Sequence, residues 1–504
     1  MQEYKFPFNS KKTILALGAE SAGNFSLWEN NRLHCSEDFG DLAVENNFLH
    51  FQSALKKFLK DNNCKPDIIL SDLHPLFQST KLAQQLSKKY TAQYLPVQHL
   101  LAHIFSAIGD RIIEHGAWNI KHSPITKIQS TNQPCHCESA SWRIIRSNPD
   151  RCQALDRHGF SSTKILAMTK SSIQNTIFGV ACDGTGLGED EKIWGGEVFA
   201  ITNNQTSNTK RVQNSKLQIT RIGHLENQIL LGGELAIQEP ARMLIAILFK
   251  ISNAAKKFPP CHSGLDPESS KSHEINTGLD SRFHGNDINI NIEKKKNIIF
   301  SYIKKYYSRS EFEVLWNQLE QNFNCVETSS TARVLDAVSV LLGFSKNERL
   351  SKHQPVKLLE ENSTKPYLDI NPKIKILNPN KAQNPNDKKS AVEYILETTP
   401  LFEYLLENLH KDKKRLAATA QKYIADGLME IIKISNQSSV ISHQEMEVAD
   451  HPLPVTAFFA SGGIMNNKII SAVLENQEFY LNQKIPRGDA GISFGQIVFY
   501  LLTK

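Results

Sequence analysis

One glycine-rich stretch decides how we interpret this chain: Phe178-Gly-Val-Ala-Cys-Asp-Gly-Thr-Gly-Leu-Gly-Glu-Asp-Glu-Lys-Ile-Trp-Gly-Gly-Glu197. An apolar run ends at Asp183, glycines follow at 184, 186 and 188, and residues 194–199 have the pattern of a return strand. This predicts a strand, a turn of exposed backbone amides and a second strand. Such amides can approach an anion closely, and Asp183 is placed to hold a metal or orient a phosphate. A glycine hairpin that binds no ligand is the alternative.

Length and composition place the chain among globular proteins of several domains. The 504 residues suffice for about two to four domains, and 40% of them are hydrophobic, which allows a sizeable core. The net charge of +6 is mild and lies on Lys-rich helices, which argues against a nucleic-acid partner. We expect no membrane span and no signal peptide. The eight scattered cysteines lack a Cys-x-x-Cys pair, so we expect reduced thiols in the cytoplasm.

The order of predicted elements indicates an α/β fold built from two similar halves. A hairpin over 13–39 is followed by helices at 48–60, 80–90 and 99–116 and by strands at 67–72 and 94–97. A second cycle begins at Ile177 with the glycine hairpin. We therefore predict a first lobe over 12–117, a second lobe over 173–504, and a cleft between them.

Two polar stretches, at about 118–172 and 253–296, lack helical or strand periodicity. Their Gly-Leu-Asp phrases resemble translated genomic repeats, so we expect repeat-like insertions, and a third polar segment links residues 361–389. A zinc site is the alternative for the first stretch, although Cys-x-Cys matches structural zinc spacing poorly. Its ligands would come from Cys135, His136, Cys137, Cys152 and His158.

Three further features carry candidate chemistry. His99 and His103 are spaced i and i+4, so on a helix they share one face and can chelate a cation; one core and one surface histidine is the alternative. An apolar strand runs into Ser461-Gly-Gly463 at a predicted helix start, where backbone amides can receive a phosphate. Asp489 lies on a tight turn before the last helix.

These phrases, in this order, resemble the C-terminal carbamoyltransferase region of the HypF family of hydrogenase maturation proteins, a family related to TsaD. The resemblance runs from about Ile14 to Leu502 outside the insertions and implies two ribonuclease-H-like lobes of the actin/Hsp70/sugar-kinase class. The phrases that carry it are Asp72-Leu-His-Pro75 with Ser79-Thr80, His99 to His103, Asp183-Gly-Thr-Gly186, Trp194-Gly-Gly-Glu197, Gly232-Gly-Glu234 with Glu239-Pro-Ala-Arg-Met243, Thr328-Ser-Ser330 with Arg333 and Asp336-Ala337, Ser461-Gly-Gly463, and Asp489.

The resemblance implies a role for each matching residue. It implies a divalent Zn or Fe ion and an adenine nucleotide or carbamoyl-adenylate, whose carbamoyl group passes to the C-terminal cysteine of a HypE-like acceptor. It identifies no catalytic side chain. The implied metal ligands are His99, His103 and Asp489, the phosphate-side residues are Asp183, Gly184, Thr185 and Gly186, and the nucleotide-side residues are Ser461, Gly462 and Gly463.

Several positions depart from the family pattern. Leu100 and Leu101 replace histidines, Ala332 replaces a glycine, and Lys352-His353 stand where a Tyr-Glu pair is usual. No YrdC-like donor-making domain precedes Met1, so we expect the donor to be supplied in trans. These departures favour one alternative, a degenerate remnant that binds nucleotide or a partner without catalysis. A TsaD-like enzyme acting on tRNA is the other, and the mild charge and the HypF-type phrases argue against it.

Overall fold

The computed structural model describes residues 1–8, 10–115, 176–203, 217–254, 286–377, 392–443 and 457–504. The segment predicted as an insertion at 118–172, most of the one at 253–296, and every residue of the alternative zinc site lie outside these ranges. None of the helices within the described ranges combines the length and the apolar character that a membrane crossing requires.

The first sheet has the strand order β1-β4-β3-β2-β5-β6. An antiparallel meander of β2, β3 and β4 continues into β5 and β6, which run parallel to β2. Asn30 and Asn31 join β3 to β4 with positive φ angles of 51° and 62°, as a tight hairpin requires. The strands are β1 (Gln2–Lys5), β2 (Ile14–Ala16), β3 (Ser26–Glu29), β4 (Arg32–Cys35), β5 (Ile68–Asp72) and β6 (Gln93–Val97).

The second sheet repeats this topology. Its order β12-β13-β9-β8-β7-β14-β15 contains an antiparallel meander of β7, β8 and β9, and β14 and β15 run parallel to β7. The short strand β11 pairs with both β10 and β8. The strands are β7 (Thr176–Leu187), β8 (Ile193–Asn203), β9 (Leu217–Leu225), β10 (Gln228–Leu231), β11 (Cys325–Thr328), β12 (Lys373–Leu377), β13 (Glu393–Glu397), β14 (Ala457–Ser461) and β15 (Tyr480–Leu481).

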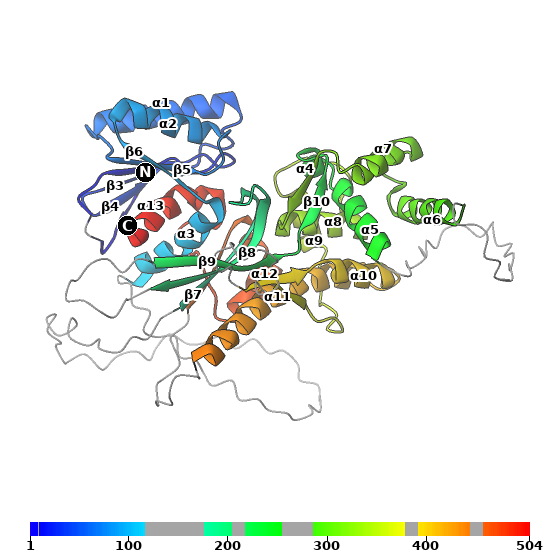
Figure 1. Cartoon of the computed structure of the whole chain (residues 1–504). Coiled ribbons are helices and arrows are strands. Elements are labelled where there is room, and N and C mark those ends of the chain that lie inside the picture. The colour runs from blue at the N-terminus through cyan, green and yellow to red at the C-terminus, as the bar shows by residue number, and fades with distance from the viewer. Residues whose placement is uncertain (9, 116–175, 204–216, 255–285, 378–391, 444–456) are drawn as a thin grey trace, which may run out of the picture.

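Two helices form a shared layer between the sheets. Helix α3 (His99–His115) follows β6, and α13 (Ile492–Thr503) follows β15, so each occupies the same place in its own cycle. The two helices pack against each other, α3 against β7 and α13 against β2 (Figure 1). Their buried residues and those of both sheets form one continuous apolar cluster. The two halves of the molecule therefore share a core, which holds α3 rigidly beside the second sheet.

The outer faces of both sheets are covered by the remaining helices. Over the first sheet, α1 (Glu45–Asp61) and α2 (Gln78–Tyr90) bury apolar residues such as Phe51 and Leu55 at helical spacing. The second sheet is covered from the other side by a larger apolar cluster. The helices on that side are α4 (Leu235–Gln238), α5 (Ala241–Ala254), α6 (Asn286–Ile303), α7 (Arg309–Glu320), α8 (Thr331–Leu342), α9 (Gln354–Glu361), α10 (Thr399–Glu407), α11 (Lys413–His443) and α12 (Lys468–Glu475).

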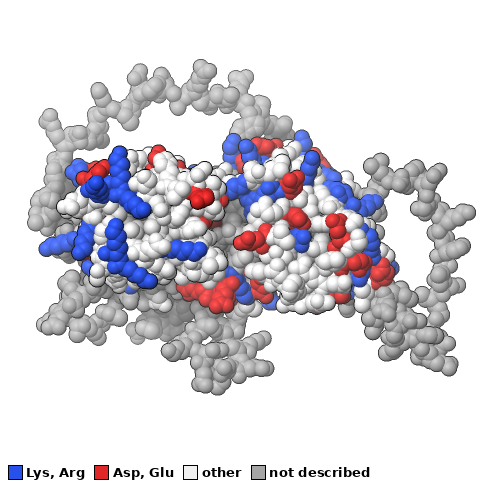
Figure 2. Space-filling view, turned by 90° about the horizontal axis from the view of Figure 1, so that it is seen from above, with Lys and Arg blue, Asp and Glu red and all other residues white. Residues whose placement is uncertain are grey.

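Positive charge gathers on the outer face of α1 and α2. Figure 2 looks down on this side of the molecule, where Lys and Arg outnumber Asp and Glu, whereas both signs are mixed elsewhere in the view. The charge predicted to be spread over several helices is therefore partly concentrated here. The exposed lysines of this face are Lys56, Lys57, Lys60, Lys81, Lys88 and Lys89.

Three local predictions differ from the structure. The glycines at 184 and 186 lie within β7 rather than in a turn, because pairing with β8 resumes at Gly186↔Trp194 after a register shift; the turn itself spans 188–192. Within the predicted link at 361–389, residues 373–377 form β12 and pair with β13. Part of the predicted polar insertion at 253–296 belongs to α6, whose later residues Ile299 and Ile303 are buried in the core.

Candidate metal centre

Four metal-ligating side chains converge where α3 begins. His99 and His103 lie on the first two turns of α3, Asp183 lies on β7, and Asp489 begins the short 3-10 helix η3 (Asp489–Gly491). One potential ligand atom from each residue lies within 4.8 Å of all the others. The Nε2 atoms of both histidines face Asp183 Oδ2, at 3.1 and 3.5 Å, and Asp489 Oδ1, at 3.6 and 3.5 Å. Residues far apart in sequence thus present one donor atom each to a common centre.

The opposite atoms of three of these ligands are held by neighbouring groups. His99 Nδ1 lies 2.6 Å from Asp72 Oδ2, at the end of β5. Asp183 Oδ1 accepts the Gly463 N–H at 3.1 Å. Asp489 Oδ2 accepts hydrogen bonds from Ser21 and Lys352. Such outer contacts fix the orientation of metal ligands and tune their basicity.

Close packing around α3 places the two imidazoles. Gly495 of α13 lies against the backbone of Ala102, and any side chain there would collide with the Ala102 carbonyl. On the other side, a Cβ at Gly179 of β7 would lie 2.6 Å from Ile104. Because glycines at both positions let α13 and β7 approach α3 closely, the imidazoles reach the end of the second sheet.

The charges of the cluster are strongly coupled. Burial lowers the pKa of His99, but the carboxylates of Asp72, Asp183 and Asp489 outweigh burial and hold that pKa well above its usual value. Burial raises the pKa of Asp183 and Asp489, yet the two imidazoles facing them bring both values below the usual range. Without a metal the cluster therefore consists of carboxylates that hold protons on the imidazoles between them.

The donor set fits a divalent transition metal. In the fully buried His103, Nδ1 has no partner among the described residues, and Nε2 faces only the two carboxylate oxygens at 3.5 Å, which is long for a hydrogen bond. An unpaired buried nitrogen is costly unless something binds it. Two imidazoles and two carboxylates are ligands that Zn and Fe accept, so Asp183 joins the His99, His103 and Asp489 set implied by the sequence.

The predicted nucleotide-side loop, Ser461 to Gly463, does not present free backbone amides at the start of an α-helix, contrary to the prediction from the sequence. The Gly462 N–H donates to the Arg487 carbonyl at 2.9 Å, and the Gly463 N–H donates to Asp183, so neither amide is free for a phosphate here. The predicted helix start is a four-residue 3-10 helix, η2 (Gly463–Asn466). Helix α12 begins only after Asn467, whose side chain caps its amides. Ser461 is buried and donates to Asn482.

Two of the four phosphate-side residues, Gly184 and Thr185, remain accessible, whereas Asp183 and Gly186 are buried. Thr185 is exposed, and a Cβ built at Gly184 meets no described atom within 4 Å. Gly186 lies against the base of His99, which ties this stretch of β7 to the candidate metal ligand. The Gly184 and Thr185 backbone is therefore the part of the predicted phosphate loop that is open next to the cluster.

A buried polar network holds β7 in place. Glu197 is fully buried, lies 2.5 Å from Arg221 Nε, and accepts a hydrogen bond from Ser329. The next residue, Ser330, donates to the carbonyls of Asp183 and Gly184. The Trp-Gly-Gly-Glu and Thr-Ser-Ser phrases of the sequence thus meet, and they hold the backbone that carries Asp183.

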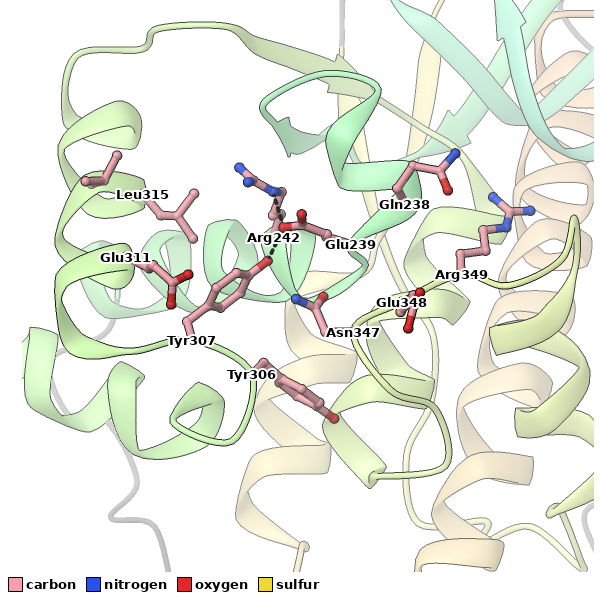
Figure 3. Close-up of a pocket in the computed structure, with 11 residues that line it drawn as sticks. Gln238, Glu239, Arg242, Tyr306, Tyr307, Glu311, Leu315, Asn347, Glu348 and Arg349 are labelled. Atoms are coloured by element: carbon pink, nitrogen blue, oxygen red, sulfur yellow. Dashed lines mark hydrogen bonds and ion pairs between the residues drawn. The ribbon is translucent and has the colours of Figure 1, made fainter. Parts of the chain in front are cut away.

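The structure also contains a cavity of about 710 Å³ on the outer side of the second sheet (Figure 3). Some polar side chains of its lining bind each other: Arg242 and Tyr307 both donate hydrogen bonds to Glu239, at 2.7 and 2.8 Å. None of the four cluster ligands is among the described residues that line it, so we regard it as separate from the metal centre. The lining residues are Gln238, Glu239, Arg242, Tyr306, Tyr307, Glu311, Val314, Leu315, Asn347, Glu348 and Arg349.

Sequence comparisons match most of this chain to known protein families and nearly all of it to a known relative. The profile of the HypF Kae1-like domain matches residues 9–110. The profile described as "Carbamoyltransferase, Kae1-like Domain, second subdomain" matches residues 179–286 and 286–496. "Probable carbamoyltransferase HypF" of Methanocaldococcus jannaschii is 30% identical over 510 residues, which cover 99% of this chain and 47% of that protein. Carbamoyltransferase HypF of Synechocystis is 23% identical and covers 87% of this chain and 42% of its own.

Solved structures show the same fold. Full-length HypF in a phosphate- and nucleotide-bound form superposes with a TM-score of 0.61 at 19% identity, and T. kodakarensis HypF with 0.60 at 21%. Each similarity covers 99% of this chain and 47% or 48% of the other. This chain thus spans about half the length of these relatives. Because the second-subdomain profile alone covers more than half of its residues, the chain belongs to the HypF carbamoyltransferase family and spans the Kae1-like region of that family.

Proposed function

We propose that this chain transfers a carbamoyl group from carbamoyl-adenylate to the thiolate of a C-terminal cysteine on a HypE-like acceptor, as a step in hydrogenase maturation. The observation that carries the proposal is the convergence of two imidazoles and two carboxylates beside an open strand backbone at Gly184 and Thr185. We further propose that the two sheets, which repeat one strand order, are ribonuclease-H-like lobes of the actin/Hsp70/sugar-kinase class with the reaction at their junction.

In this proposal His99, His103, Asp183 and Asp489 hold a divalent Zn or Fe ion. Such an ion supplies Lewis-acid stabilisation of negative charge on the donor's phosphate. The thiolate sulfur forms a bond to the carbamoyl carbon, the bond from that carbon to the phosphate oxygen breaks, and AMP leaves with the bonding electron pair. No side chain of this chain becomes covalently modified in this step.

The surrounding residues orient the ligands and the donor. Asp72 accepts the Nδ1 proton of His99 and so leaves the Nε2 lone pair facing the centre. Gly184 and Thr185 are accessible next to Asp183, and we propose that their backbone lies along the donor's phosphate. The network of Glu197, Ser329 and Ser330 keeps this backbone fixed while the donor binds.

The proposal requires partners. The chain spans 47% of the length of its M. jannaschii relative, and we propose that a YrdC-like donor-making domain supplies carbamoyl-adenylate from elsewhere. We place the reaction in the cytoplasm, a reducing compartment that suits unpaired thiols. The free cysteines among the described residues are Cys35, Cys64, Cys182 and Cys325.

One alternative rests on specific contacts. The Lys352 ammonium lies on Asp489, and the Gly462 and Gly463 amides are engaged within the protein. These contacts favour a protein that retains the fold and binds a nucleotide or a partner without transferring a carbamoyl group. Carbamoyl transfer and binding without transfer differ in whether an acceptor protein gains a carbamoyl group.

The test is mass spectrometry of a HypE-type acceptor after incubation with metal-loaded chain and separately generated carbamoyl-adenylate. The proposal expects a carbamoyl increment on the acceptor's C-terminal cysteine that is lost in His103→Ala and kept in His50→Ala, a change at an exposed histidine of α1. An unlabelled acceptor in the presence of bound metal and bound nucleotide would establish the non-catalytic alternative.

A further inference from the structure

We propose that Lys352 sets the charge of this metal centre, weakening its hold on a divalent cation and strengthening its hold on an anionic phosphate. This inference rests on the proposed metal-dependent function. It concerns a residue that belongs to none of the phrases that carry the resemblance to the family.

The Asp489 carboxylate separates the Lys352 ammonium from the candidate cation position. Its Nζ lies 3.2 Å from Asp489 Oδ2, whereas the other oxygen, Oδ1, faces the Nε2 atoms of His99 and His103. It also donates to the Ser21 hydroxyl at 2.7 Å and, weakly, to the Ser21 carbonyl at 3.4 Å. A single carboxylate thus lies between the fixed ammonium and the centre, so the two positive charges would repel each other at short range.

A charge balance shows what the ammonium contributes. Among the described residues, Asp72, Asp183 and Asp489 bring three negative charges to the cluster, and Lys352 brings one positive charge. Two negative charges remain, and a divalent cation cancels them when the histidines are neutral. Without Lys352, the loaded site would carry one negative charge and would repel a phosphate.

Lys352 is placed to reach an incoming ligand. Its side chain is 46% exposed, in contrast to the nearly buried Asp489 at 10%. It approaches from the turn before α9, on the side of the second sheet, and reaches Ser21 in the turn after β2 of the first sheet. An ammonium has three donors, so the long bond to the Ser21 carbonyl can be exchanged for a phosphate oxygen without loss of the Asp489 contact.

The neighbouring His353 does not supply the same charge. Burial lowers the pKa of His353, and the positive charges of Lys352 and Arg349 lower it further, so its imidazole is neutral near pH 7. Its ring lies within 3.8 Å of a Cβ built at Gly463, on the Asp183 side of the cluster. The fixed positive charge at the opening of the centre therefore comes from Lys352.

The experiment compares Lys352→Met, Lys352→Arg and a control, Lys357→Met, in the full chain. Lys357 lies on α9, is 71% exposed, and pairs with Glu361 at 3.8 Å, so the control removes one charge from the helix that follows Lys352, away from the centre. Zn²⁺ affinity is measured by competition with a chromophoric chelator, and AMP affinity by calorimetry on the zinc-loaded protein. All three substitutions are at exposed side chains, which leaves folding intact.

The two affinities should move in opposite directions. In Lys352→Met, Zn²⁺ should bind about three- to thirtyfold more tightly and AMP about tenfold more weakly, while Lys352→Arg and the control stay near wild type. If Lys352→Met weakens Zn²⁺ binding, Lys352 merely holds Asp489 and the inference is wrong. Unchanged affinities would overturn it as well and leave the proposed function standing. A wild type that binds no Zn²⁺ would overturn the proposed function and, with it, this inference.

Discussion

The outer contact between Asp72 and His99 offers the sharpest test of the metal centre. Asp72 is buried, its Oδ2 lies 2.6 Å from His99 Nδ1, and its Oδ1 accepts the His74 N–H at 3.0 Å. Both oxygens therefore act as acceptors. An asparagine has the same shape but offers one acceptor and one donor, so Asp72→Asn cannot satisfy both neighbours in either orientation of its amide.

The expected effect follows from these two bonds. If the amide nitrogen faces His99, the ring must accept at Nδ1 and carry its proton on Nε2, the nitrogen that faces the centre, and the metal loses a ligand. If the amide nitrogen faces the backbone N–H of His74 instead, two buried hydrogen-bond donors point at each other, which costs roughly 1–3 kcal/mol of stability. Loss of an outer contact to a metal ligand typically lowers affinity 10–100-fold, which corresponds to about 1.4–2.7 kcal/mol.

The assay is a Zn²⁺ competition titration combined with urea unfolding of the metal-free protein. The matched control is Asp67→Asn, at the exposed residue directly before the same strand, where the side chain accepts the Thr13 N–H at 2.8 Å. An asparagine oxygen can keep that single bond, so zinc affinity should be unchanged. Equal zinc affinity of folded Asp72→Asn and wild type would refute the assignment of His99 as a ligand oriented through Nδ1.

Two further predictions concern protons and the nucleotide. The facing carboxylates outweigh burial and raise the pKa of His99 and His103, so Zn²⁺ must displace protons from both imidazoles when it binds. The Zn²⁺ affinity should therefore rise with pH, by up to about tenfold per pH unit for each displaced proton, and level off above the pKa values of the folded protein. A pH-independent affinity with no proton release in calorimetry would contradict this. Gly184→Val should weaken AMP binding with little change in Zn²⁺ affinity, because a Cβ there meets no described atom within 4 Å; undiminished AMP affinity would place the phosphate elsewhere. Gly463→Val cannot make this distinction, since its Cβ would lie 2.9 Å from the candidate ligand Asp183.

Local sequence patterns were sufficient for most elements of the first half of the chain, although they missed the edge strand β1. Helical spacing of apolar residues gave α1 and α3 within a few residues of their observed bounds, and short apolar runs gave β5 and β6. The patterns failed where pairing partners decide the structure. Strand β12 lies beside an Asn/Lys/Pro-rich segment and is a strand because β13 pairs with it, and the glycines of β7 are extended because β8 continues opposite them.

For the candidate site, sequence spacing identified donors but not what holds them. The i, i+4 spacing of His99 and His103 required only that the segment be helical. The contact of Asp72 with His99 depends on the pairing of β5 with β6, whereas the contacts of Ser21 and Lys352 with Asp489 depend on how the two sheets meet at the shared helix layer. Nothing in the local sequence indicates either arrangement. This distinction bears on the proposed function, because the charge of the cluster depends on contacts between residues far apart in the sequence. In our proposal, Lys352 beside the Asp489 carboxylate changes which ligands the centre prefers without changing any of its four donors.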